Sequence, residues 1–286
     1  MKKTPLFLLL LLMITAMSCS NDDDDTADTE EYFEYKYDNS DVEITGWTAQ
    51  KNGDRYIIQA QGNGQNFAIE FNKYGNLASA NSYSTSNLNF PLSQSFAYYS
   101  SYSFDFNLQN IDTDNQMIKA DFDGLLYEDN YLINSTTHQV SGSFNVKYTE
   151  YPEDEISKVS CKIDNQDWHA TNGDHSSSNQ YETYSTFNDD KFIINLMYID
   201  GFLNTCNNCS FTPNSNLRMQ LDIYDPVNDD IIECPSTGTL SITNYSPPTG
   251  FSNGVIEGEF NFTATNPQNN QTHQIDNGHF KLIITP

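Results

Sequence analysis

Short stretches in which apolar and polar residues alternate recur along most of the chain after residue 31. A period of two is typical of strands that bury one face and expose the other. No window beyond the first eighteen residues has the apolar spacing of an amphipathic helix of ordinary length. The pattern predicts an all-β fold of antiparallel, half-buried sheets. The clearest runs are residues 67–71, 104–108, 140–148, 159–163, 192–198, 217–223 and 256–262.

Turn residues divide these runs into hairpins and into two larger regions. Gly62, Asn63 and Gly64 separate the run 56–61 from the run 67–72, and they favour the positive φ angles of a tight hairpin. Proline and acidic residues interrupt the alternation at 151–155. The sequence therefore predicts two tandem domains, residues 32–150 and 156–286. Each can be an antiparallel sandwich or a barrel-like domain, because alternation does not show which strands pair.

The two regions also contain a weak internal repeat. Trp47 precedes the run 55–58 much as Trp168 precedes the run 191–194. The segment 140–146 matches the segment 256–262, in the same order and at a similar separation. These matches predict a tandem duplication.

The first eighteen residues have the three parts of a secretory signal peptide. Lys2 and Lys3 are followed by an apolar run at 6–14 and by small residues before Cys19. The apolar run is shorter than the roughly 20 residues that a membrane-spanning helix needs. A cysteine at this position can carry lipid, so residues 1–18 are predicted to be a lipoprotein signal peptide and Cys19 the lipidated residue. The alternative is ordinary secretion with an incidental Cys19.

An acidic stretch follows the cysteine. Residues 19–21 and the four aspartates Asp22, Asp23, Asp24 and Asp25 resemble the start of Bacteroidota surface lipoproteins. In those proteins such a stretch accompanies export to the outer face of the outer membrane. The resemblance implies a lipid-anchored outer-membrane protein that faces the cell exterior. The alternative is that residues 19–31 are only a solvated, self-repelling tether.

The second region resembles an uncharacterised family of secreted bacterial β domains, with the first region as a more diverged copy. The resemblance is carried by residues 159–170, 238–243, 256–264 and 275–280. It implies an architecture and no activity.

The charge of the chain bears on its partners. The sequence contains 39 acidic residues against 13 lysines and arginines, a formal net charge of −26. Such a chain repels phosphate backbones, whose binding depends on lysine and arginine. Nucleic acid is therefore excluded as an expected partner.

All four cysteines after Cys19 lie in the second region: Cys161, Cys206, Cys209 and Cys234. An even number of cysteines in an exported domain favours two disulfides, whose pairing the spacing does not decide. The alternative is a zinc site of four thiolates.

Two further groups of residues could bind metals. Residues 112–116 begin like a calcium-binding loop, but Met117 stands where an EF-hand needs glycine, so only a looser calcium site is expected. His169 and His175 lie near Asp167 and Asp174, a mixture that can bind a transition metal but also arises by composition in polar loops. No other cofactor is predicted.

The sequence contains no nucleophile elbow, metalloprotease helix motif or phosphate-binding glycine loop. Tyr98, Tyr99 and Tyr102 crowd one serine-rich segment, where exposed rings would suit sugar binding; the alternative is that they fill the core. The predicted function is a non-enzymatic binding or accessory protein at the cell surface, with polysaccharide as the favoured ligand. Three alternatives are a component of a surface complex, an extracellular hydrolase, and a membrane-side carrier built as a closed barrel with an apolar interior.

Overall fold

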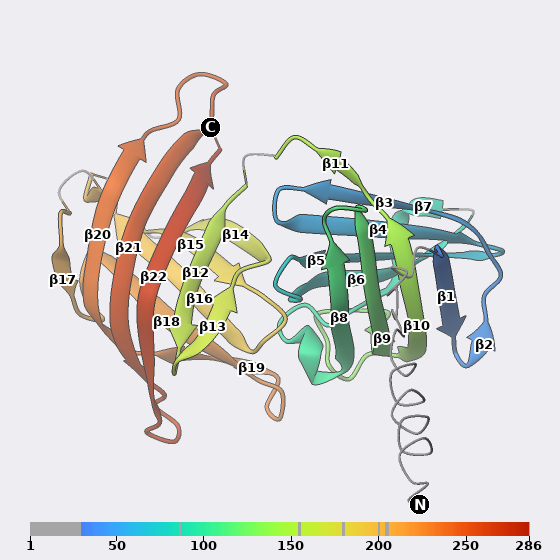
Figure 1. Ribbon diagram of the computed structural model, residues 1–286. Helices are drawn as coiled ribbons and strands as arrows, with labels where there is room; N and C mark the ends of the chain where they lie inside the picture. The colour runs from blue at the N-terminus through green and yellow to red at the C-terminus, as the bar shows by residue number, and fades with distance from the viewer. Residues whose placement is uncertain are drawn as a thin grey trace, which may run out of the picture. The chain divides into compact units, whose positions relative to one another are not determined.

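The computed structural model describes residues 30–85, 87–153, 156–178, 181–199, 201–203 and 206–285. The predicted signal peptide, Cys19 and the four aspartates lie outside the described residues. Residues Glu31–Pro286 form one compact unit. Its described residues form strands β1–β22 and the short 3₁₀ helix η1 (Ser100–Tyr102), so the predicted all-β fold is confirmed (Figure 1).

The first half of this unit, β1–β11, forms one long sheet that folds over a core. Its order is β11-β3-β4-β5-β6-β7-β9-β10-β1-β2, with β8 also paired to β9. Strands β3–β7 follow one another as a meander, and β7 meets β9 at the single pair Gln94 and Tyr127. The bounds are β1 (Tyr32–Tyr37), β2 (Ser40–Asp41), β3 (Ile44–Asn52), β4 (Arg55–Gly62), β5 (Gln65–Asn72), β6 (Leu77–Ser84), β7 (Asn87–Gln94), β8 (Phe104–Asp112), β9 (Met117–Tyr127), β10 (Thr137–Lys147) and β11 (Thr149–Tyr151).

The second half, β12–β22, is a sandwich of two sheets. The six-stranded sheet has the order β13-β12-β22-β21-β20-β17, and the five-stranded sheet has the order β14-β15-β16-β18-β19. The bounds are β12 (Lys158–Ile163), β13 (Gln166–His169), β14 (Asn172–Ser178), β15 (Tyr181–Phe187), β16 (Phe192–Ile199), β17 (Cys209–Phe211), β18 (Leu217–Asp225), β19 (Asp230–Cys234), β20 (Ser236–Ser246), β21 (Gly254–Thr265) and β22 (Thr272–Ile284).

Alternation builds both cores in the way the sequence predicts. On β4, Tyr56, Ile58 and Ala60 are buried, and on β21, Ile256 and Phe260 are buried. The core of each half consists of such inward-facing residues from its sheets. In the described residues each strand order runs between two unpaired ends, so the halves are layered sheets and not closed barrels.

Two glycines let aromatic rings cross between β21 and β22. Gly258 is paired with Phe280, and Phe260 with Gly278. A Cβ atom added to Gly258 would lie 2.4 Å from Cζ of Phe280, and one added to Gly278 would lie 2.2 Å from Cε2 of Phe260. Each ring therefore occupies the space that a larger residue opposite would need.

The two halves share one strand order. The first half contains β8-β9-β10-β1-β2 and the second contains β20-β21-β22-β12-β13, so in each the first strand pairs with the last long one. In this order β10 of the first half corresponds to β22 of the second. The sequence match instead aligned the segment 140–146 of β10 with 256–262 of β21. A glycine followed two residues later by phenylalanine occurs on both β21 and β22, which explains the difference of one strand.

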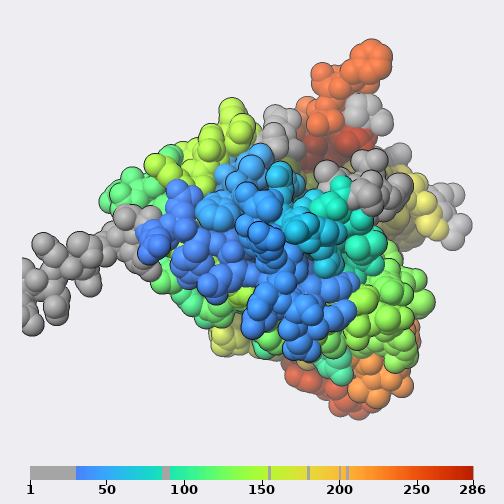
Figure 2. Space-filling model, turned by 90° about the vertical axis from the view of Figure 1, so that its right-hand side faces the viewer, coloured from blue at the N-terminus to red at the C-terminus, as the bar shows by residue number. Residues whose placement is uncertain are grey.

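One loop departs from the compact body. The connection between β20 and β21, around residue 250, extends away from the neighbouring strands (Figures 1 and 2). Phe251 at its tip is fully exposed.

Candidate binding cavity

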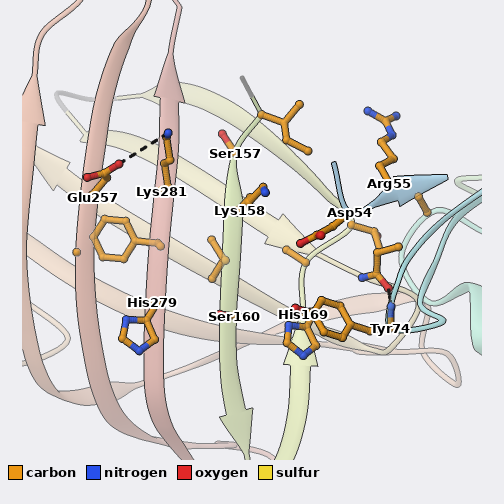
Figure 3. Close-up of a pocket in the computed structure, with 18 of the residues that line it drawn as sticks. Asp54, Arg55, Tyr74, Ser157, Lys158, Ser160, His169, Glu257, His279 and Lys281 are labelled. Carbon is orange, nitrogen blue, oxygen red and sulfur yellow. Dashed lines mark hydrogen bonds and ion pairs between the residues drawn. The ribbon is translucent and has the colours of Figure 1, made fainter. Parts of the chain in front are cut away.

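A cavity of about 350 Å³ lies between the first half and the six-stranded sheet of the second (Figure 3). This volume falls within the range of small-molecule sites, which begins at about 300 Å³. The first half contributes residues from the β3–β4 and β5–β6 turns, and the second half contributes residues of β12, β13, β20, β21 and β22. The polar side chains labelled in Figure 3 are Asp54, Arg55, Tyr74, Ser157, Lys158, Ser160, His169, Glu257, His279 and Lys281.

Strand register places the second-half residues in rows. Lys281 on β22 is opposite Lys158 on β12 and opposite Glu257 on β21. His279, two residues before Lys281, is opposite Ser160 on β12. Because alternate residues of a strand share a face, these side chains all lie on the outer face of the sheet. The residues between them, such as Val159 and Phe280, point into the sandwich core.

Ion pairs hold the charged side chains on the second-half wall. Lys281 Nζ lies 3.8 Å from Glu257 Oε1, as the dashed line in Figure 3 shows. His279 Nδ1 lies 3.7 Å from Glu259 Oε1, and Lys158 pairs with Glu153. These groups are largely exposed, so each pair adds little to stability.

The first-half wall is built in the same way. Lys73 Nζ lies 2.9 Å from Asp54 Oδ1, and Arg55 pairs with Glu70. In each pair one residue, Asp54 or Arg55, lies at the turn that joins β3 to β4. The charged groups of this wall are therefore also matched with opposite charges.

Two stacked rings close one side of the cavity. The rings of Tyr74 and His169 have centroids 3.6 Å apart and are almost parallel, with an interplanar angle of 4°. Burial lowers the pKa of His169 and Lys73 lowers it further, while the Asp167 carboxylate opposes both. The imidazole is therefore predominantly neutral at neutral pH.

Hydrogen bonds near the cavity join the two halves. The carboxylate of Asp189, in the β15–β16 turn, accepts Asn76 Nδ2–H at 3.0 Å and the Leu77 N–H at 3.2 Å. Asn172 Nδ2 donates to the Ala78 carbonyl at 3.0 Å. Desolvation raises the pKa of Asp189, and the two accepted hydrogen bonds offset part of this effect.

The tyrosines predicted to bind sugar lie elsewhere. Tyr98 is half-buried, and its ring stacks on Tyr224 of the second half with centroids 5.5 Å apart. Tyr99 and Tyr102 form a tilted pair 5.7 Å apart, and Tyr102 is 53% exposed. None of the three predicted tyrosines lines the cavity. Tyr98 thus fits the alternative of a packing role, whereas the ring of Tyr102 remains accessible.

The cysteines form one disulfide where the sequence predicted two. Cys206 and Cys209 are joined, with Cα atoms 5.4 Å apart, while Cys161 and Cys234 are buried free thiols. The structure therefore contains the first predicted disulfide and not the second, and both free cysteines are inward-facing core residues of β12 and β19. Burial raises the pKa of Cys161 to about 12. Burial, together with the Asp222 charge, raises that of Cys234 to about 11.

The predicted metal-binding residues have other partners. Asp112 accepts the backbone N–H groups of Asp114 and Asn115, each at 3.0 Å, and Asn115 Nδ2–H at 2.7 Å. These hydrogen bonds, first that of the Asn115 side chain, lower the pKa of Asp112. His175 Nε2 lies 2.6 Å from Glu182 Oε2, whereas the ring of His169 stacks on Tyr74. Within the described residues, no three His, Cys, Asp or Glu side chains are grouped so that they could hold a metal.

A contact that sequence reasoning missed occurs in the first half. Asp38 lies in the turn after β1, and its Oδ2 is 2.9 Å from His138 Nδ1 on β10. Its Oδ1 accepts the Gln139 N–H at 3.1 Å. Asp38 and Asn39 have φ angles of 48° and 61°, which suit an Asp-Asn turn. We call this arrangement the Asp–His clasp.

The same clasp occurs at the corresponding place in the second half. Asp164 Oδ2 lies 2.7 Å from His273 Nδ1, and Asp164 Oδ1 accepts the Gln274 N–H at 2.9 Å. Asp164 and Asn165 have φ angles of 52° and 67°. Two matches in the sequence could have indicated that the clasp occurs twice. Residues 36–41 match 162–167, and the Thr-His-Gln segment 137–139 matches 272–274.

Among the described residues, no helix is long and apolar enough to cross a membrane. Comparisons with protein-family models, with curated proteins and with solved structures give no match.

Proposed function

We propose that this protein is an exported, non-enzymatic binding protein that captures an extracellular saccharide in the cavity between its two halves. The cavity itself is the observation that carries the proposal. It combines apolar surface from Tyr74, Ile156 and Ala170 with hydroxyl, carboxylate and ammonium groups. Saccharides present apolar ring faces and many hydroxyl groups, which this mixture can meet.

The proposed location follows from the sequence. Lipid on Cys19 anchors the chain to the outer membrane, Asp22–Asp25 direct it to the cell exterior, and the acidic segment to residue 31 serves as tether. Labelling with a fatty acid should mark the wild type and not Cys19→Ala. Replacing the four aspartates by alanine should protect the protein from protease added to intact cells; unchanged cleavage would remove the surface-export part of the proposal.

The binding proposal is tested with the purified mature chain and a panel of polysaccharides. Thr243 is exposed and lines the cavity, so Thr243→Trp should fill the site with little effect on folding. Wild type should bind at least one saccharide, and Thr243→Trp should bind it at least about tenfold more weakly, a loss of about 1.4 kcal/mol. The matched control is Thr239→Trp on the same strand, which is outside the cavity lining.

Other outcomes separate the alternatives. Binding that Thr243→Trp leaves unchanged would place the site elsewhere, with Tyr102 the first residue to substitute. Absence of saccharide binding together with a cross-linked protein partner on cells would favour a component of a surface complex.

The hydrolase alternative has one observation in its favour, since three carboxylates line the cavity: Asp54, Glu257 and Glu259. A glycosidase needs one carboxylic acid in apolar surroundings as a proton donor. Here each carboxylate instead lies beside a cation or an imidazole. Release of reducing ends from a bound saccharide, abolished by Glu257→Gln or Glu259→Gln, would establish the hydrolase.

We also propose that the two halves are copies of one ancestral domain. The shared strand order and the two Asp–His clasps support this. Both halves have the same order of five strands, and in both an aspartate in the same turn contacts a histidine on the paired strand. Independent folding of residues 32–151 and 156–286, each expressed alone, would be the expected result. Failure of either half to fold alone would count against two autonomous domains.

A further inference from the structure

The cavity is electrically balanced, although the chain is not. The sequence carries 39 acidic residues and 13 basic ones. The charged lining of the cavity, histidines aside, consists of equal numbers of carboxylates and cations: Asp54, Glu257, Glu259, Arg55, Lys158 and Lys281. The cavity thus lacks the excess of negative charge that the rest of the molecule has.

Each of these six groups has a partner of opposite charge or an imidazole beside it. Within the cavity Lys281 pairs with Glu257 at 3.8 Å, and Glu259 lies 3.7 Å from His279. The other partners are Lys73 for Asp54, Glu70 for Arg55 and Glu153 for Lys158. An ammonium group has three donors and a carboxylate about four acceptor positions, so one contact leaves most of them unused.

We infer that the cavity selects an uncharged sugar unit over an acidic one. This inference rests on the proposed saccharide-binding function and specifies its ligand. A hydroxyl group both donates and accepts, so a neutral sugar can use the donors and acceptors of the lining without disturbing an ion pair. An acidic sugar that uses the same donors would bring its negative charge close to Glu257 or Glu153, each of which already neutralises the lysine beside it.

The electrostatic field of the whole molecule also favours neutral over acidic saccharides. A net charge of −26 repels polyanions at long range, most strongly at low salt. An acidic saccharide therefore meets repulsion on approach as well as competition inside the cavity. A neutral saccharide meets neither.

The test compares matched neutral and acidic probes on the mature chain by calorimetric titration. The neutral probes are hexasaccharides of glucose, mannose, xylose and galactose, and the acidic ones are hexagalacturonate and hexamannuronate. We expect the best neutral probe to bind at least about tenfold more tightly than either acidic probe at moderate salt. Binding of both classes should be weakened by Thr243→Trp.

A charge variant makes the test specific to the lining. Glu257→Gln combined with Glu259→Gln keeps the shape of the side chains and leaves Lys281 and His279 without their carboxylates. The ratio of acidic to neutral affinity should rise at least about tenfold in this variant. The matched control is Glu34→Gln with Asp105→Asn, two exposed strand carboxylates outside the cavity lining, which should leave the ratio unchanged.

The possible results separate this inference from the proposed function. Tighter binding of an acidic probe by the wild type, lost in Thr243→Trp, would overturn the inference and leave the saccharide site standing. An unchanged ratio in the charge variant would also overturn it. No binding of any probe would overturn both.

Discussion

The two halves contain the same clasp in different surroundings. In the first half the His138 side chain is 23% exposed and its ring stacks on Tyr37, with centroids 4.9 Å apart. In the second half the His273 side chain is only 4% exposed, and its ring meets Phe192 edge to face at 5.3 Å. The hydrogen bonds within the two clasps are nearly equal in length.

The difference shows that the same motif can contribute different amounts to the free energy of unfolding, depending on how deeply it is buried. A hydrogen bond near water replaces one that water could make, whereas breaking one in the interior leaves a group unsatisfied. The second-half clasp should therefore contribute more to stability than the first. Each half contains one tryptophan, Trp47 and Trp168, so replacing either by phenylalanine leaves a fluorescence signal that reports the other half alone.

The largest expected effect is that of His273→Ala. The substitution creates a void in the core and removes the partner of Asp164, so it should lower the free energy of unfolding of the second half by about 2 to 3 kcal/mol. His138→Ala should cost the first half about 1 kcal/mol or less. Denaturant titrations followed by the fluorescence of Trp168 and Trp47 measure the two values. Equal losses would contradict the role assigned to burial.

Asp164→Asn should have the next largest effect, about 1 kcal/mol after allowing for its exposure to solvent. Burial raises the pKa of Asp164, but the hydrogen bonds from Gln274 and His273 outweigh it and hold the pKa below its usual value. A lowered carboxyl pKa contributes stability above the unfolded value of about 4, and this is lost as the pH falls through the folded value.

The difference between wild type and Asp164→Asn should therefore be present at pH 7 and disappear in strong acid. Asp38→Asn supplies the matched comparison in the first half and should cost less at pH 7. A difference for Asp164→Asn that persists at low pH would show that the carboxylate charge is not the cause.

Reduction of the Cys206–Cys209 disulfide should affect only the second half. The bond closes a very short loop, so the chain-entropy argument gives an upper limit of about 2 kcal/mol for its removal. Addition of a reductant should shift the transition reported by Trp168 and leave that of Trp47 unchanged. A shift of both transitions would mean that the halves unfold as one unit.

The smallest expected effect is on thiol reactivity in the native state. The raised pKa values of Cys161 and Cys234 keep both thiols protonated at neutral pH, and burial keeps reagents away. A thiol reagent should label neither cysteine in the folded protein and both after denaturation without reductant. Absence of labelling after denaturation would indicate that the two cysteines are oxidised to a second disulfide.

Local sequence pattern predicted the all-β fold but not the contacts between distant strands. Alternation identified the inward residues of β5 and β21, and the Gly62 to Gly64 segment identified a hairpin. The sequence match aligned β10 with β21, whereas the shared strand order aligns β10 with β22, because glycine and phenylalanine alternate on both β21 and β22. To predict the clasp, one must know that the first strand of each half pairs with its last long strand.

The cavity could not be predicted for the same reason. Its walls come from turns of the first half and strands of the second that are separated by more than a hundred residues, as Asp54 and His169 are. Tyr98 and Tyr99 are adjacent aromatic residues where a strand would alternate apolar and polar positions, and the ring of Tyr98 stacks on Tyr224 of the second half. A residue that leaves the strand pattern can do so to pack against another part of the chain.

Hydrogen exchange with and without a saturating neutral hexasaccharide tests the proposed binding cavity most directly. Exchange should slow in the segments that line it, around Lys158 to Ser160 on β12 and Glu257 to Glu259 on β21, and this protection should be absent in Thr243→Trp. Protection confined to residues 98–102, with β12 and β21 unchanged, would contradict a binding site in the cavity.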